Sequence, residues 1–249
     1  MTNLRFTIQY DGTRYDGWQR QGNTGNTIQG KMEHVLSQMV GHAAEIHGAG
    51  RTDAGVHARA QIAHCKLNTA LTPREIRDYC NRYLPEDIAV TACDEADERF
   101  HARLNATGKR YVYRLWTDAV PNVFERRFVC PWERALDLDT MRRAAAQVCG
   151  THDFRAFSSN KRMKKSTMRT VTRLDIERIG GEVRLTVEGD GFLYNMVRIL
   201  AGTLVEIGQG DRAPDSIPAI LDSCDRAQAG ITLPARGLIL DEVFYSVDF

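Results

Sequence analysis

The sequence lacks the features that define several protein classes. No apolar run approaches the roughly 20 residues that cross a bilayer, and the first residues lack the unbroken apolar segment of a signal peptide. We therefore expect a cytoplasmic protein. The 249 residues are 43% hydrophobic and 26% charged, which is typical of a globular protein and excludes disordered and collagen-like classes. A chain of this length can fold without a disulfide or metal staple.

Motifs for metals, redox chemistry and nucleotides are also missing. The six cysteines include no C-x-x-C pair and the seven histidines no H-x-x-x-H pair, so we expect buried free thiols and no metal. Gly12 and Gly17 have the spacing of a P-loop, but Trp18 and Gln19 follow where a P-loop needs Lys and Ser or Thr. The sequence predicts neither nucleotide hydrolysis nor a cofactor.

Periodicity predicts a first half with the order β-α-β-β-α-β. Thr27 is a candidate N-cap for the first helix. Thr72, Pro73 and Glu75 supply the N-cap, the first-turn proline and the capping-box acid of the second, which should run to about Tyr83. The expected elements are strands near 4–10, 44–49, 60–67 and 88–93 and helices near 28–39 and 73–83.

The second half repeats this order. We expect strands near 111–116, 170–179, 182–190 and 238–245, helices near 139–150 and 194–207, and a short inserted helix near 214–221. The boundary falls in the loop near residues 104–108, without a low-complexity linker. The sequence thus predicts an α/β fold of two ferredoxin-like halves, residues 1–104 and 105–249.

One loop between two predicted strands has an unusual composition. Residues 48–58 read GAGRTDAGVHA, and the glycines allow tight turns and close approach to a ligand. Arg51 and Asp53 lie two positions apart, so in an extended loop both side chains project to one side. A carboxylate held ionised by a guanidinium can act as a nucleophile or base. An ordinary turn aspartate is the competing interpretation.

This string resembles the catalytic motif of the tRNA pseudouridine synthase A family. The resemblance covers nearly the whole chain. Further motifs follow in the family's order: YDGTRYDGWQRQ at 10–21, FHAR at 100–103, KRYVY at 109–113, GFLYNMVR at 191–198 and PARGL at 234–238. Several motifs in the right order are far more specific than one alone.

The resemblance implies conversion of uridine to pseudouridine at positions 38, 39 and 40 of the tRNA anticodon stem-loop. It also implies a homodimer, no cofactor, and two α/β halves around a long mixed, mainly antiparallel sheet. By carry-over, Asp53 is the catalytic aspartate and nucleophile, and Arg51 helps to displace the target base. Tyr111 stacks on the target uracil, and Arg198 pairs with Asp53.

Physical arguments support part of this assignment. Arg198 lies in a strongly apolar helical stretch, where a buried cation needs an acidic partner, although it could instead extend to the surface. Tyr111 could equally be a core aromatic, as we expect for Tyr113. Three roles for Asp53 stay open: attack on C1′, addition to uracil C6, or removal of a sugar proton.

The charge distribution predicts where RNA binds. The net charge is only +1, but the charges are unevenly distributed. Residues 155–173 contain basic and no acidic residues, and residues 86–98 contain acidic and no basic residues. We expect 155–173 to be a phosphate-binding loop, and one basic face centred on Asp53. The candidate RNA-binding residues are Arg20, Arg103, Arg110, Tyr111, Lys161, Lys164, Lys165, Arg169 and Leu238.

Two other functions remain open on sequence grounds. The chain could be a catalytically silent RNA-binding module on the same scaffold, although its intact motif residues argue against that. It could also be a synthase that modifies other tRNA positions, because docking geometry decides the choice of target.

Overall fold

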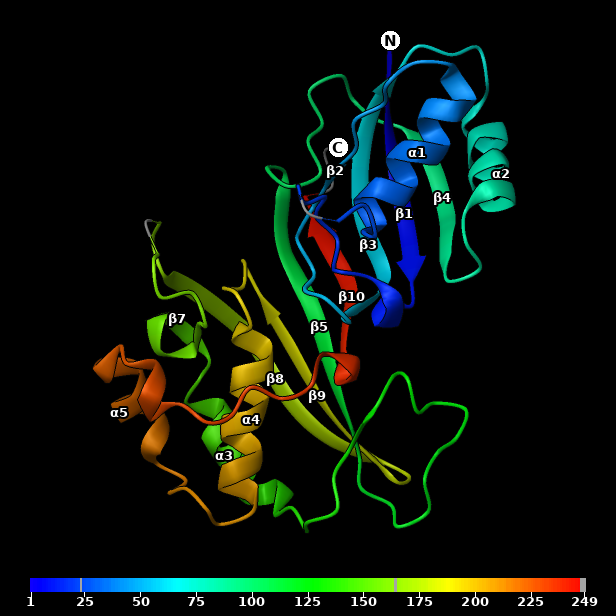
Figure 1. Ribbon diagram of the computed structural model, residues 1–249. Helices are drawn as coiled ribbons and strands as arrows, with labels where there is room; N and C mark the ends of the chain where they lie inside the picture. Colours follow the sequence, from blue (N-terminus) through cyan, green and yellow to red (C-terminus); the bar gives the residue numbers. More distant parts are fainter. Residues whose placement is uncertain (23, 164, 247–249) are drawn as a thin grey trace. The chain divides into compact units, whose positions relative to one another are not determined.

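Two structural units make up the chain, and the computed structural model describes residues 1–22, 24–163 and 165–246 of it (Figure 1). The first unit contains Met1–Thr107 and the segment that begins at Leu240, and the second contains Gly108–Ile239. The chain passes between the units within two strands, β5 (Ala106–Trp116) and β10 (Leu238–Tyr245).

The end of the chain differs from the predicted division, which kept everything after residue 104 in the second half. Residues 240–246 belong to the first unit. The Tyr245 hydroxyl donates to the Ala102 carbonyl at 2.6 Å, and Asp241 pairs with Arg59 at 3.3 Å. These contacts join residues more than 140 positions apart, so no local pattern in the sequence indicates them.

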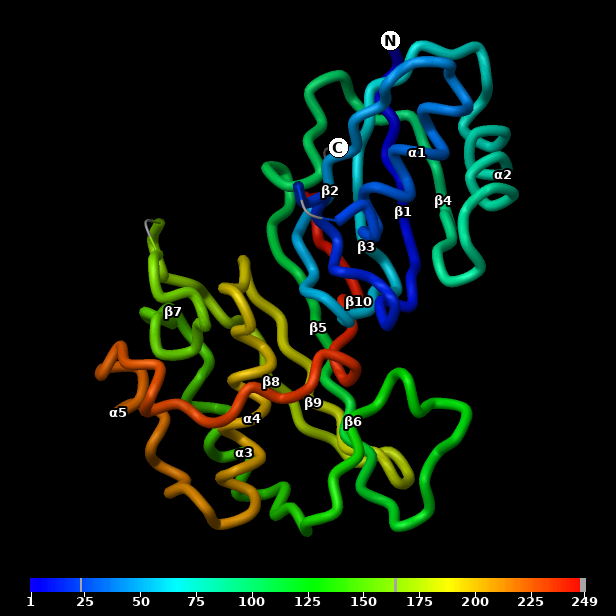
Figure 2. Tube along the Cα trace, viewed as in Figure 1, coloured from blue at the N-terminus to red at the C-terminus, as the bar shows by residue number. Residues whose placement is uncertain are grey.

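The first unit is an antiparallel sheet with two helices. Its elements are β1 (Thr2–Tyr10), η1 (Gly12–Arg14), α1 (Ile28–Val40), β2 (His47–Gly48), β3 (His57–Leu67), α2 (Pro73–Tyr83) and β4 (Ile88–Glu95). The strand order is β4-β1-β3-β10, with β2 paired to β3. Figure 2 traces the long connection from β1 to α1, which contacts the loop that precedes β3.

The predicted helix starts of this unit are confirmed. The Thr27 hydroxyl accepts from Gly30 N at 3.2 Å. The capping box is complete, because Thr72 Oγ1 accepts from Glu75 N and Glu75 Oε2 accepts from Thr72 N. The strand expected near 44–49 is shorter than predicted and spans only His47–Gly48, where it pairs with β3.

The second unit has the same general construction. Its elements are β5, β6 (Cys130–Pro131), α3 (Leu138–Ala146), β7 (Gly150–Asp153), η2 (Arg155–Phe157), β8 (Met168–Ile179), β9 (Glu182–Gly189), α4 (Met196–Gly208), α5 (Ser216–Ser223), η3 (Arg226–Gln228), η4 (Ala235–Gly237) and the start of β10. The strand order is β5-β9-β8-β7, all antiparallel, and α3 packs against both α4 and β8. Each unit is therefore a mainly antiparallel sheet with helices packed on it, which confirms the predicted α/β class.

The prediction of a single basic loop over 155–173 is wrong. Arg155 opens the short helix η2, and Arg169 and Arg173 lie on β8. The strand forms because apolar Val171, Leu174 and Ile176 are buried against the unit's core. Arg173 also pairs with Asp175 and Glu188, so its charge is compensated within the sheet.

The cysteines and the length of the helices bear on two further expectations. All six cysteines are free thiols, as predicted; four are buried, and Cys149 and Cys224 are half-buried. Within the described residues, no helix has both the length and the apolar character needed to span a bilayer.

A buried ion pair joins β5 to β9. Arg114 Nε and Nη2 each donate to a carboxylate oxygen of Glu182 at 2.7 Å, and neither side chain is more than 7% exposed. Arg184 Nε also donates to Glu182 at 2.7 Å. Burial raises the pKa of Glu182, but the hydrogen bonds from Arg114 and Arg184 outweigh it and hold this pKa below its ordinary value.

We predict that Glu182→Ala lowers the free energy of unfolding by about 3 kcal/mol near pH 7, because it leaves the Arg114 guanidinium buried without its main partner. The folded-state pKa of Glu182 lies below the unfolded value of 4.5. The contribution of the carboxylate is therefore complete above pH 4.5 and is lost as the pH falls through the folded-state pKa. Urea unfolding across this pH range measures both effects.

The matched control is Asp211→Ala, which removes the exposed partner of Arg134. We expect a much smaller change, because exposed pairs contribute little. Equal losses for the two variants would contradict a special contribution from the buried pair.

Candidate active site

The loop that carries Asp53 connects β2 to β3, and residues 49–56 form neither helix nor strand. Backbone hydrogen bonds from the segment between β1 and α1 hold it on both sides of Asp53. Trp18 N donates to Thr52 O at 3.0 Å, and Gly55 N donates to Tyr15 O at 3.3 Å. The backbone at Asp53 is thus fixed by contacts that an isolated loop would lack.

Thr52 anchors this loop from the inside. Its side chain is buried, and its hydroxyl lies 2.7 Å from the Tyr10 hydroxyl. Burial raises the pKa of Tyr10, so the phenol stays protonated. Arg51 on one side of Thr52 is exposed and Asp53 on the other is half-buried, the alternation expected of an extended segment.

Glycines let the opening segment lie against this loop. A Cβ at Gly12 would lie 2.0 Å from the Val56 carbonyl oxygen, and one at Gly17 would lie 2.7 Å from the Thr52 carbonyl oxygen. Gly17 also has a φ of +93°, which side chains other than glycine rarely adopt. The opening motif and the Asp53 motif are therefore one packed structure.

In the second unit, Tyr111 lies on β5 opposite Val187 of β9. Its ring meets the Phe192 ring edge to face, with centroids 5.3 Å apart. Tyr113, on the same strand, is completely buried, and its hydroxyl donates to the Pro234 carbonyl at 2.7 Å. Tyr113 is therefore a packing residue, whereas Tyr111 sits beside the loop that leads into α4.

Arg198 lies half-buried in the first turn of α4. Its Nε donates to the Leu233 carbonyl at 2.6 Å, and its Nη1 donates to Asn195 Oδ1 at 2.8 Å. Both acceptors are uncharged. A cation at a helix N-terminus is electrostatically unfavourable, so Arg198 gains no stabilisation from the helix dipole.

The start of α4 departs from ordinary helix chemistry in another respect. Asn195 is the N-cap, yet its φ is +61° and its side chain makes no capping hydrogen bond. The Asn195 amide instead binds Arg198. Backbone strain together with an unfavourably placed cation is typical of a functional site. Asn195 was not among the predicted site residues.

The candidate RNA-binding residues lie in both units. Arg20, Arg103, Lys161 and Lys165 are exposed, Arg110 and Arg169 are half-buried, and Leu238 is buried at the start of β10. Lys164 lies outside the described residues. Arg110 donates to Glu188 at 2.8 Å and Arg20 pairs with Glu33 at 3.0 Å, so part of this set already has acidic partners.

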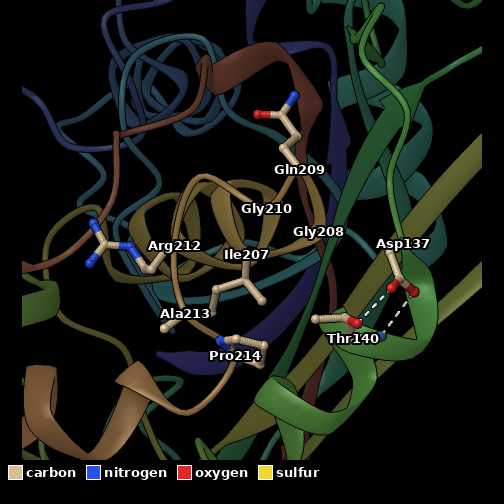
Figure 3. A pocket seen from close by; sticks show the side chains of 9 residues that line it. All are labelled: Asp137, Thr140, Ile207, Gly208, Gln209, Gly210, Arg212, Ala213 and Pro214. Atoms are coloured by element: carbon tan, nitrogen blue, oxygen red, sulfur yellow. Dashed lines mark hydrogen bonds between the residues drawn. The ribbon is translucent and has the colours of Figure 1, made fainter.

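A separate surface pocket of about 450 Å³ lies between α3 and the end of α4. Figure 3 shows Asp137 capping α3 through Thr140 at its rim, with Ile207 and Pro214 among the lining residues. None of the predicted site residues lines this pocket. Among the described residues, no cluster of His, Cys, Asp or Glu side chains is arranged to hold a metal ion.

A family model described as tRNA pseudouridine synthase matches residues 7–105 and 144–246. The chain belongs to the tRNA pseudouridine synthase family. The matched segments contain Arg51, Asp53 and Arg198, whereas Tyr111 lies between them.

Relatives of similar length extend the likeness to the whole chain. A protein named tRNA pseudouridine synthase A from Bacillus sp. (strain KSM-64) is 48% identical over 245 residues, which cover 98% of this chain and all of the relative. Proteins from Bacillus anthracis and Acetivibrio thermocellus are 45% and 42% identical, each over 98% of this chain and at least 99% of the relative. The resemblance stated from the motifs is thereby confirmed.

We predict that Gly17→Ala lowers the free energy of unfolding by about 1–3 kcal/mol and slows catalysis, because the new methyl group meets the Thr52 carbonyl and displaces the Asp53 loop. Gly25→Ala is the matched control, since a Cβ there meets nothing within 4 Å. Urea unfolding and turnover of tRNA are measured for both. Wild-type behaviour of Gly17→Ala would show that the close approach is not needed.

Proposed function

We propose that this protein isomerises uridine to pseudouridine at positions 38, 39 and 40 of the tRNA anticodon stem-loop. The observation that carries the proposal is the full-length likeness to relatives named tRNA pseudouridine synthase A, together with the Asp53 loop held by the opening motif. The family likeness supports the reaction class, and the specific positions are part of the proposal.

The reaction breaks the N1–C1′ glycosidic bond and joins C5 of the same uracil to C1′. The C5 proton is lost and N1 gains a proton, so the conversion is a redox-neutral isomerisation. Ordinary glycosidases use two carboxylates, one of which protonates the leaving group. Here the uracil must be retained and water must not capture C1′, which suits a single carboxylate, Asp53, in a site that excludes water.

The other proposed roles follow from the need to reach the base. The target nucleotide must leave its stack, at a cost of a few kcal/mol. Arg51, exposed beside Asp53, would occupy the gap, and the Tyr111 ring would stack on the extruded uracil. Arg198 would pair with Asp53 and keep it ionised. The Arg198 guanidinium uses two of its N–H groups on neutral acceptors, and its other N–H groups can donate to a carboxylate.

Assembly and location belong to the same proposal. We infer a homodimer from the family resemblance alone, and we expect the enzyme to act in the cytoplasm. No step of the proposed reaction uses a metal or a cofactor.

We predict that Asp53→Asn abolishes turnover while tRNA still binds, because the amide keeps the size of the side chain and loses its nucleophilic and basic character. The assay is release of tritium from C5-labelled uridine in unmodified tRNA, with the modified positions mapped and binding measured separately. Asp78→Asn, an exposed aspartate of α2, is the matched control and should retain activity.

The outcomes separate the alternative functions. No release by the wild-type protein, with binding intact, supports a silent RNA-binding module. Release from sites outside the anticodon arm supports a synthase with other targets. Full activity of Asp53→Asn rules out Asp53 as the catalytic group.

We predict that neutralising Lys161, Lys164 and Lys165 weakens tRNA binding and flattens its dependence on salt, by roughly one unit of log–log slope for each lost phosphate contact. Lys161 and Lys165 are exposed on the segment between η2 and β8. Arg74, Arg77 and Arg82 on α2 supply a control triple neutralisation of the same charge. An unchanged slope in the lysine variant would exclude this segment from RNA binding.

A further inference from the structure

Two polar residues interrupt the buried face of α1. Gln29 and Glu33 are each 6% exposed and lie one turn apart among buried Ile28, Met32 and Leu36. Buried polar side chains are costly unless their hydrogen bonds are satisfied. Gln29 Nε2 donates to Glu33 Oε1 at 2.9 Å and to the Ile46 carbonyl at 3.2 Å.

The hydrogen bonds continue from Gln29 to the Asp53 loop. Gln29 Oε1 accepts from Gln19 Nε2 at 2.7 Å and from Arg20 N at 2.9 Å. Gln19 Oε1 in turn accepts from Arg51 Nε at 2.9 Å. A line of two amides thus connects a buried carboxylate of α1 to the arginine two residues before Asp53.

This line has only one possible direction. The Ile46 carbonyl can only accept and the Arg20 backbone N–H can only donate, so together they fix which end of the Gln29 amide is the oxygen. The Gln29 oxygen then requires the NH₂ group of Gln19, which leaves the Gln19 oxygen facing Arg51. Arg51 can only donate. The groups around Gln29 and the Arg51 side chain therefore require the same orientation of the Gln19 amide.

We propose that Gln19 is a positioning residue for Arg51, oriented by the buried Gln29–Glu33 pair. A free arginine side chain loses rotamer freedom when it is fixed, which costs free energy at the moment of binding. Gln19 fixes it beforehand through Nε and leaves the Nη1 and Nη2 groups for the RNA. The proposal rests on the proposed function, because it assigns to Arg51 a role at the displaced base.

The decisive variant is Gln19→Met, which keeps the length of the side chain and removes both hydrogen bonds. We expect the single-turnover rate on tRNA to fall about 10- to 100-fold, the equivalent of one hydrogen bond to a charged group, with little change in tRNA affinity. In the Arg51→Ala background, Gln19→Met should have no further effect, because Gln19 acts only through Arg51. Gln38→Met, on the exposed side of α1, is the matched control.

A second measurement does not depend on activity. In the nitrogen-15 NMR spectrum, the Arg51 Nε–H signal is assigned by its loss in Arg51→Ala. Its hydrogen exchange should be slow in the wild-type protein and in Gln38→Met, and at least several-fold faster in Gln19→Met. The Nε–H of Arg14, bound to Asp87 at 3.0 Å, serves as an internal reference.

The results distinguish this inference from the proposed function. Unchanged exchange of Arg51 in Gln19→Met, or an equal loss of rate with and without Arg51, overturns the role of Gln19. Absence of tritium release by the wild-type protein overturns the proposed function instead, and the exchange measurement then still decides whether Gln19 fixes Arg51.

Discussion

The candidate site depends on one backbone contact, between the segment that follows β1 and the loop that precedes β3. The Asp53 loop has no regular secondary structure, and the hydrogen bond from Val56 N to the Asp53 carbonyl at 3.1 Å is a local turn that does not fix the whole loop. Hydrogen bonds with Tyr15 and Trp18 supply that constraint, and Gly12 and Gly17 permit the approach. The buried contact between Tyr10 and Thr52 then holds the Thr52 side chain inside, whereas its neighbours Arg51 and Asp53 are exposed and half-buried, respectively. A rigid support of this kind would hold the carboxylate proposed for catalysis in one position.

The second unit shows the opposite relation between stability and function. Its sheet is tied together by the buried Arg114–Glu182 pair and by the completely buried Tyr113. At the start of α4, however, Asn195 has a left-handed backbone and Arg198 opposes the helix dipole. These departures are maintained because the surrounding helix is buried along most of its length. Well-packed elements can therefore hold local strain at the residues proposed for catalysis.

Much of the fold could be predicted from the sequence, for local reasons. The Thr72–Glu75 capping box acts over three residues, and the alternation along β1 and β9 acts over two, so short windows contain the whole signal. Prediction failed where pairing with a distant strand decided the outcome. Arg155, Arg169 and Arg173 look like parts of one basic loop, but Arg169 pairs with His152 of β7 and Arg173 with Glu188 of β9, which places both in β8. The order of motifs identified Asp53 as a candidate and indicated the family, which the relatives confirm.

The amino-acid sequence was enough to predict the helix starts, the α/β class and the motif around Asp53, because each depends on neighbouring residues. The return of the last strand to the first unit and the support of Arg51 by Gln29 and Glu33 through Gln19 follow from long-range packing. The bond between Gln19 and Arg51 spans 32 positions of sequence. A hydrogen bond of that separation exists only after α1 and the sheet have packed together, so no pattern along the chain can reveal it.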